Sequence, residues 1–234
     1  MEKRLWEYRI QSPNEASTTF YANLHGITQL MVFDQNTLIN HTITESEQAP
    51  EAPEKSICLD AELPFTLIPD AFKETGIPGW EGAIRRFPVE GAVLCYGSHA
   101  ENSYHAAVPV YLLAQEASKQ GDVVYCYCQQ DRCIIFVFRG GQCELANSYP
   151  VQGESEIMYF CLAAAKKSGA DLKQLQVKLL GNDTKTLVQA LERFGVHAAA
   201  VQLELPYPAG EYPPYPAESF LLCQLHTCVL QEAN

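Results

Sequence analysis

The chain has 234 residues, of which 47% are hydrophobic and 10% aromatic, so it can bury a sizeable core and is not a disordered protein. It holds 16 Lys and Arg against 28 Asp and Glu, and the net charge of −12 repels phosphate backbones and anionic lipids. We therefore expect neither a nucleic-acid partner nor a membrane partner.

The N-terminal residues and the cysteines indicate the compartment. Charged residues interrupt the first positions, and no run of 18 apolar residues follows anywhere. We therefore expect no export signal, no membrane span and a cytoplasmic location. In that compartment the nine cysteines are expected to be reduced thiols that pack as small hydrophobic side chains.

The first half of the chain begins with a predicted antiparallel meander. Residues favourable to strands concentrate at 18–24, 27–33 and 37–44, and short polar segments separate them. The next segment, residues 45–56, holds four Glu and two Pro and predicts an acidic solvated loop. The sequence thus predicts three paired strands followed by an exposed connection.

Two more strands and a helix complete the first half. The strands are expected at 65–68 and 91–96. Apolar residues spaced by three and four predict a helix over 104–119. Pro109 lies inside this segment, so the helix is expected to be kinked or to start late.

The second half repeats this order more clearly. Strands are predicted at 123–128, 133–138 and 142–149, then a helix between Gly153 and Gly169, a strand at 177–181, a helix from Asp183 to Gly195 and a strand at 196–203. The order is β-β-β-α-β-α-β.

The last segment is rich in proline and tyrosine. Residues 205–216 contain five Pro and three Tyr, which predicts an extended loop before a final helix that starts at Glu218. Its tyrosines either pack on the body of the protein, which we favour, or bind an aromatic groove of a partner.

Together these patterns predict a duplicated α/β protein. We expect an N-terminal half of residues 1–121 and a C-terminal half of residues 122–234, each with the same order of strands and helices.

Several segments resemble an uncharacterised bacterial family of unknown function that has an actin-like ATPase fold. In the second half these are residues 123–138, 144–149, 154–159 and 177–181, and in the first half residues 66–72 and 86–88. The resemblance implies two ribonuclease H-like βββαβαβ halves that lie side by side. The family has no established activity to transfer, but its fold raises the question of ATP binding.

An actin-like ATPase holds the nucleotide phosphates with hairpin turns that carry Asp, Gly and a hydroxyl residue. The first hairpin here keeps Gly26 and Thr28 but has Asn23 where a carboxylate is expected to hold magnesium. The second hairpin contains Asp131 but no glycine. The double glycine expected on the adenosine side is reduced to Gly181, which precedes Asn182. These six residues are the candidate nucleotide-binding site, although ordinary turn roles explain Gly26, Gly181 and Asn182 better.

The sequence gives even less support to two other kinds of catalytic site. A ribonuclease H-type nuclease needs three or four carboxylates on the first and fourth strands, and the predicted strand interiors offer none. The sequence Cys95-x-x-x-His99, followed by His105, suggests a nucleophile pair without showing how the thiol would be activated.

Four cysteines lie on neighbouring predicted strands. Cys126 and Cys128 share a strand face, while Cys133 and Cys143 lie on adjacent strands. A thiolate zinc site is geometrically conceivable, but buried small hydrophobic residues explain the pattern equally well.

The sequence therefore favours a non-catalytic, pseudo-ATPase scaffold or adaptor that binds a protein partner through an interdomain cleft or an exposed sheet edge. We assign no catalytic residue, no metal ligand and no cofactor, and the oligomeric state is left open. The alternative is a noncanonical ATP-binding or ATP-hydrolysing protein that uses magnesium. In that case Mg·ATP should raise the melting temperature, and Gly181→Trp should abolish the shift while leaving the fold intact.

Overall fold

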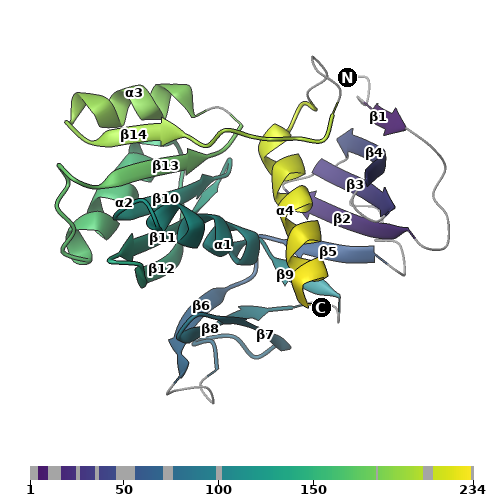
Figure 1. Ribbon diagram of the computed structural model, residues 1–234, viewed down its shortest axis with the longest axis horizontal. Helices are drawn as coiled ribbons and strands as arrows, with labels where there is room; N and C mark the ends of the chain where they lie inside the picture. The colour runs from purple at the N-terminus through teal and green to yellow at the C-terminus, as the bar shows by residue number, and fades with distance from the viewer. Residues whose placement is uncertain are drawn as a thin grey trace. The chain divides into compact units, whose positions relative to one another are not determined.

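The computed structural model describes residues 5–9, 17–24, 27–34, 37–45, 56–70, 76–98, 102–182, 184–207 and 213–232. Contacts group the chain into two compact units (Figure 1). Unit 1 comprises residues 1–63, 98–106 and 203–234, and unit 2 comprises residues 64–97 and 107–202. The chain therefore passes between the units more than once. The predicted division into residues 1–121 and 122–234 stays a prediction.

Unit 1 contains a six-stranded sheet with the order β1-β4-β3-β2-β5-β9. The strands are β1 (Leu5–Arg9), β2 (Thr18–Leu24), β3 (Ile27–Asp34), β4 (Thr37–Glu45), β5 (Ser56–Asp60) and β9 (Ser103–His105). The predicted meander is confirmed as β2, β3 and β4, which pair antiparallel. β5 and β9 extend the sheet in parallel on the other side of β2.

Unit 2 contains a five-stranded sheet with the order β12-β11-β10-β13-β14. Its strands are β10 (Val123–Cys128), β11 (Arg132–Arg139), β12 (Gln142–Pro150), β13 (Gln176–Leu180) and β14 (His197–Ala200). The first three pair antiparallel, and β13 and β14 follow in parallel. The order matches β4-β3-β2-β5-β9 of unit 1, so the predicted duplication of strand order is confirmed.

Helices cover both faces of the unit 2 sheet. α2 (Glu154–Lys167) joins β12 to β13, and α3 (Lys185–Arg193) joins β13 to β14. Their apolar residues form one buried cluster with alternate residues of β10, β11 and β13, among them Cys126, Ile135 and Leu179. On the opposite face, α1 (Ala107–Ser118) packs on β10 and β11 through Tyr111, whose ring contacts Phe136 and Phe138.

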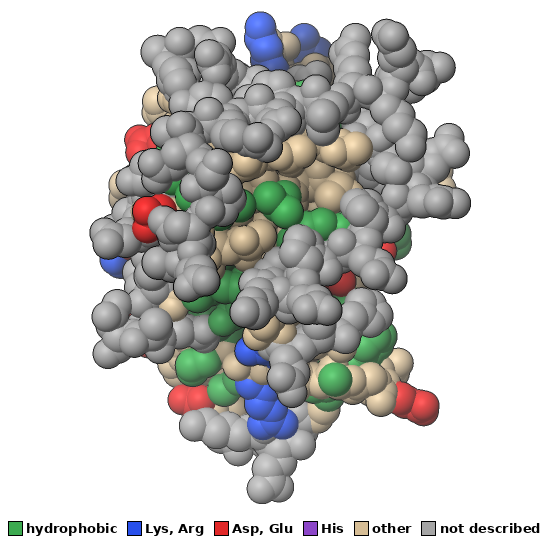
Figure 2. Space-filling model, turned by 90° about the vertical axis from the view of Figure 1, so that its right-hand side faces the viewer, with side chains coloured by type: hydrophobic (Ala, Val, Ile, Leu, Met, Phe, Trp, Pro, Cys, Tyr) green, Lys and Arg blue, Asp and Glu red, His purple; other side chains and the backbone are tan. Residues whose placement is uncertain are grey.

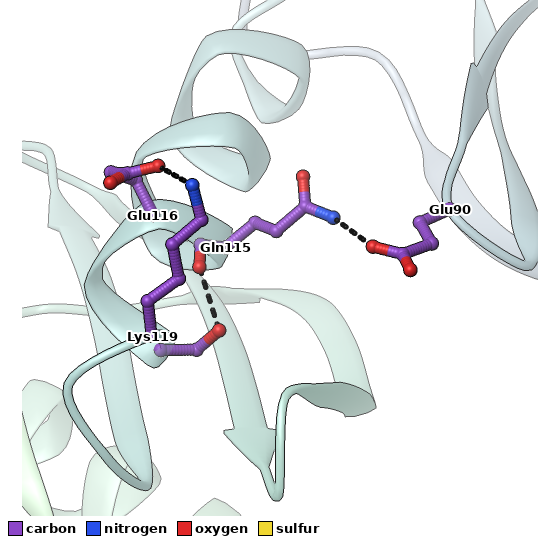
Figure 3. A network of polar contacts seen from close by, with 5 residues as sticks. Glu90, Gln115, Glu116 and Lys119 are labelled. Atoms are coloured by element: carbon purple, nitrogen blue, oxygen red, sulfur yellow. Dashed lines mark hydrogen bonds and ion pairs between the residues drawn. The ribbon is translucent and has the colours of Figure 1, made fainter.

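A small antiparallel sheet with the order β6-β8-β7 also belongs to unit 2. It consists of β6 (Phe65–Pro69), β7 (Ile84–Val89) and β8 (Ala92–Gly97). Gln115 of α1 donates a hydrogen bond from Nε2 to Glu90 at the β7–β8 turn, 3.3 Å away, while Lys119 and Glu116 form an exposed ion pair (Figure 3). The small sheet thus contacts the end of α1.

The last helix of each predicted half does not pack on the sheet of that half. α1 follows β9 of unit 1 but packs on the unit 2 sheet, and α4 (Pro216–Glu232) follows unit 2 but packs on β2 of unit 1. His226 of α4 stacks on Phe33 with ring centroids 4.1 Å apart, and Phe20 packs edge-on against the His226 ring. The two helices are therefore exchanged between the sheets.

Several predicted boundaries change in the structure. The helix predicted from residue 104 begins at Ala107, because residues 103–105 form β9. Pro109 is its third residue, where a missing N–H costs no helical hydrogen bond, so the late start is confirmed. The final helix begins at Pro216 rather than Glu218, and the last strand ends at Ala200 rather than 203. Residues 46–55 of the acidic loop and Asp183, the predicted helix cap, lie outside the described residues.

Candidate functional site

The first candidate turn connects β2 and β3 in unit 1. Asn23 and Thr28 are paired across the two strands, and Gly26 lies outside the described residues. The Thr28 side chain is buried. Burial raises the pKa of Tyr21 on β2, and the neighbouring Thr28 side chain acts in the opposite direction. Thr28 Oγ1 itself has no hydrogen-bond partner in the described part of the chain, so this buried hydroxyl is one of the polar atoms that a ligand could satisfy.

The second candidate turn, between β10 and β11, is a closed two-residue loop. The Gln129 backbone N–H donates to the Arg132 carbonyl at 2.8 Å, and Asp131 follows Gln130 at the exposed tip. The Asp131 carbonyl accepts a hydrogen bond from the Val151 backbone at 2.8 Å, which fixes the turn against the end of β12. A phosphate cradle needs several backbone N–H groups directed outward, and here the Gln129 N–H is satisfied inside the turn.

Buried polar atoms remain at the base of this turn. The Gln129 side chain is buried, and its Nε2 lies 3.5 Å from the Tyr127 hydroxyl. Gln129 Oε1 and Arg132 Nε have no hydrogen-bond partner among the described residues. Buried polar groups without partners cost free energy, so a polar ligand at this end of β10 would stabilise the protein by supplying those partners.

Gly181 and Asn182 follow β13 at the same end of the sheet, because β10 and β13 are parallel neighbours. A Cβ atom at Gly181 would lie 3.1 Å from the Cys128 carbonyl oxygen and 2.9 Å from Thr184 Cγ2. Glycine is therefore required by close packing against β10. Even a methyl group there would require Thr184 or Cys128 to shift, so Gly181→Trp is expected to disturb this end of the sheet instead of leaving the fold intact.

The structure thus brings Asp131, Gly181 and Asn182 to one end of the unit 2 sheet, and places Asn23 and Thr28 in unit 1. Among the described residues, no group of three or more His, Cys, Asp and Glu side chains is placed to hold a metal ion.

Four thiols converge in the unit 2 core. Cys126 Sγ lies 3.7 Å from Cys128 Sγ, and hydrogen bonds with Cys128, Cys133 and Cys161, together with burial, raise the pKa of Cys126 well above its ordinary value. Cys126, Cys133 and Cys161 are part of the buried apolar cluster, and Cys128 packs against it. Sequence reasoning missed Cys161, which α2 contributes, and only its place on the buried face of a helix could have indicated it.

Cys143 does not join this cluster. The register shifts between Val137 and Phe138, so that Cys143 pairs with Phe138, on the face of the sheet that α1 covers. There its Sγ donates to the Leu145 carbonyl at 3.4 Å, and burial raises its pKa to about 12. The bulge, which turns the side chain to the other face, could not be read from the spacing.

Of the predicted set of Cys95, His99 and His105, the structure describes Cys95 and His105, and the Cys–His pairing stays a prediction. Cys95 is buried in β8 of unit 2, and burial raises its pKa. His105 is buried in β9 of unit 1, where its Nε2 is hydrogen-bonded to the Leu63 carbonyl at 2.7 Å. His99 lies outside the described residues. Both described members therefore occupy ordinary core positions.

One tyrosine of the Tyr-Pro segment packs on the body of the protein, as predicted. The Tyr207 hydroxyl forms a hydrogen bond with His41 Nδ1, and the two rings lie 5.3 Å apart. Residues 208–212 of this segment lie outside the described residues, and its docking on a partner stays a prediction.

On the face shown in Figure 2, the described Lys and Arg side chains lie in small separate groups with Asp and Glu among them. Among the described residues, no helix combines the length and apolar character needed to cross a membrane.

Comparison with known structures identifies the fold. A solved structure from Bacteroides thetaiotaomicron, described as a protein with actin-like ATPase fold and unknown function, matches with a TM-score of 0.72 at 16% identity and covers 92% of this chain and 96% of that chain. The filament structure of AlfA from a B. subtilis plasmid matches with a TM-score of 0.46 at 14% identity, covering 88% and 97% of the two chains. The chain has an actin-like fold.

The sequence comparison is more specific. The profile of a family described as protein of unknown function (DUF3822) matches residues 100–197, which include α1 and the whole unit 2 sheet up to the start of β14. No curated protein sequence matches the chain. The resemblance to an uncharacterised family with an actin-like fold is confirmed.

Proposed function

We propose that this chain is a non-catalytic scaffold of actin-like fold that binds a protein partner by adding a strand to β14. The observation that supports the proposal is the exposed edge of the unit 2 sheet. β14 is the end strand of that sheet and pairs with β13 in regular parallel register (Figure 1). Edge strands are normally protected by charges, proline or bulges, but β14 has the sequence His-Ala-Ala-Ala.

The hydrogen-bonding groups of this edge can be assigned from the ladder. Val201 N–H donates to the Leu179 carbonyl at 2.8 Å. Because the direction alternates along a strand, the backbone groups of Ala198 and Ala200 point away from β13. An extended peptide could pair with these groups, and the small alanine side chains leave space for those of the peptide.

The turn geometry supports the non-catalytic part of the proposal. The Gln129 N–H is used inside the β10–β11 turn, and Gly181 serves to pack the next loop against β10. The alternative, a noncanonical ATP-binding protein, is favoured by the buried, unpartnered atoms Gln129 Oε1 and Arg132 Nε. A rise of several degrees in melting temperature with millimolar Mg·ATP would support the alternative and contradict a pseudo-ATPase.

The test of strand addition is Ala200→Pro. Ala200 is exposed and its N–H points outward, so proline removes an edge donor without breaking the β13–β14 ladder. Ala200→Ser keeps the N–H and is the matched control. Each of the three proteins is immobilised on a resin and incubated with an extract of the native cells. The proteins that bind are then quantified by mass spectrometry.

We expect a bound species that the wild type and Ala200→Ser retain and Ala200→Pro loses. The same bound proteins in equal amounts on all three would contradict binding at β14. Circular dichroism and the melting temperature show whether the proline variant keeps its fold.

A further inference from the structure

The exposed face of α2 carries a pattern of residues that is complementary to itself. Tyr159 is 64% exposed, and Leu162, three residues further along α2, is half-buried beside it. On this face, Glu156 lies in the first turn of α2, and Lys166 and Lys167 lie in the last. The face is therefore acidic at one end, apolar in the middle and basic at the other end.

The spacing of these residues fits an antiparallel pair of identical helices. Glu156 and Lys167 are eleven positions apart, which is close to three helical turns, so they lie on one stripe. In an antiparallel pair, residues on one stripe contact each other when they are equidistant from the twofold axis. The twofold axis passes the midpoint of each contacting pair. The midpoint of Glu156 and Lys167 lies one residue, or about 1.5 Å along the helix, from the midpoint of Tyr159 and Leu162, so one axis can serve both contacts.

We propose that α2 forms a homodimer interface with α2 of a second copy of this chain. In this dimer the Tyr159 ring lies over Leu162 of the other copy, and Glu156 of each copy pairs with Lys167 of the other. Both contacts occur twice because the interface is isologous.

The Tyr159 ring is already held in place for this contact. It packs edge-to-face on Phe160, with centroids 5.3 Å apart, and Phe160 stacks on Tyr149 of β12 at 4.3 Å. A side chain that is ordered before association loses less entropy on binding. The exposed aromatic ring is thus supported from beneath as an interface anchor.

The charges of this face favour a second copy as the occupant. The whole chain has a charge of −12, so an arbitrary surface of it would be repelled by another copy. Antiparallel α2 helices instead place the acidic end of each against the basic end of the other. This arrangement is independent of β14, and Ala200→Pro is expected to leave the dimer unchanged.

The test is the oligomeric state, measured by sedimentation over a range of protein concentrations. We expect a dimer for the wild type. Tyr159→Ala should weaken dimerisation about thirtyfold, the usual scale for a central aromatic anchor. Phe194→Ala removes an aromatic side chain of similar exposure, 66%, from outside α2 and should leave the dimer unchanged.

A charge exchange tests the antiparallel register. Glu156→Lys and Lys167→Glu should each be monomeric, since each places like charges together twice. An equal mixture of the two variants should dimerise, because both ion pairs are restored in the heterodimer. Glu154→Lys makes the same charge change on another face of the helix and serves as the control for dimerisation.

A monomeric wild type, or a dimer that Tyr159→Ala does not weaken, would overturn the proposal. So would a mixture of the charge variants that stays monomeric although both are folded. Glu156 also accepts a hydrogen bond from the Gln152 backbone at 2.7 Å. Should Glu156→Lys fail to fold, Tyr159→Ala and Lys167→Glu, which leave this bond in place, decide the outcome.

Discussion

The two sheets share one strand order but differ in the chemistry of their interiors. Under α4, the unit 1 sheet buries polar side chains, including Gln29, His41 and Ser219. Under α2 and α3, the unit 2 sheet buries thiols and aliphatic side chains. The difference shows that one strand order is compatible with two kinds of interior: an apolar one, and one in which polar side chains such as Ser219 and Gln29 are buried against each other.

The largest effect expected from this comparison is a pH dependence that belongs to unit 1. Burial lowers the pKa of His41 from 6.5 to about 3. The folded state therefore holds His41 neutral, and its contribution to stability is complete above pH 6.5 and is lost as the pH falls toward 3. The loss amounts to roughly 5 kcal/mol at most, at 1.36 kcal/mol for each pKa unit.

His41→Phe should remove this part of the pH dependence. Urea unfolding at a series of pH values measures the free energy of unfolding for the wild type, for His41→Phe and for His197→Gln, which changes an exposed histidine of unit 2. The His197 variant should follow the wild type. An equal pH slope in the wild type and His41→Phe would show that His41 is not the titrating group.

A smaller effect is expected at the buried contact between α4 and β3. The Ser219 hydroxyl donates to Gln29 Oε1 at 2.9 Å, and Gln29 Nε2 has no partner among the described residues. Ser219→Ala would leave the buried Gln29 amide without this contact, at a cost of about 1–3 kcal/mol. The double variant with Gln29→Leu should recover most of the loss in chemical unfolding, because no buried amide remains. Additive losses would mean that the two residues are not coupled.

The smallest effect is expected at Cys161. A hydroxyl in place of this thiol should lower the free energy of unfolding, whereas the Ser219 hydroxyl of unit 1 raises it. Cys161 is fully buried in the apolar cluster of unit 2. Cys161→Ser should lower the free energy of unfolding by about 1–2 kcal/mol, since it buries a hydroxyl among weak hydrogen-bonding thiols. Cys161→Ala should cost less. If serine is tolerated better than alanine, the contrast between the two interiors is wrong.

The strands with strong patterns could be predicted from the sequence, and the weak ones could not. β10 and β11 are apolar and rich in aromatic and β-branched residues, and both were predicted within one residue. β7 contains two arginines and a proline, which a sequence pattern does not favour but an exposed strand of a small sheet tolerates. β1, β5 and β9, which have five, five and three residues, were not predicted. Length alone does not explain this, because β6 and β13 also have five residues; Tyr104 and His105 of β9 lay in the segment predicted as a helix.

Of the candidate site, the turn positions could be predicted but not what they contact. Gly181 looked like a turn or ligand-binding glycine, whereas its close approach to Cys128 depends on the pairing of β10 with β13. The contact of His41 with Tyr207 joins residues 166 positions apart. A local sequence pattern carries no information about contacts between residues so far apart in the chain. These contacts could therefore be identified only from the three-dimensional structure.

The exchange of α1 and α4 has a consequence for biosynthesis. The strands of unit 1 are made early, but α4, which covers β2, follows all the other described helices and strands in the chain and is made after them. Until then the apolar side chains beneath it, such as Phe20 and Phe33, have no cover from this helix. During translation the nascent chain therefore exposes an uncovered sheet face, which can aggregate. A fragment that ends before residue 216 would expose the same face permanently.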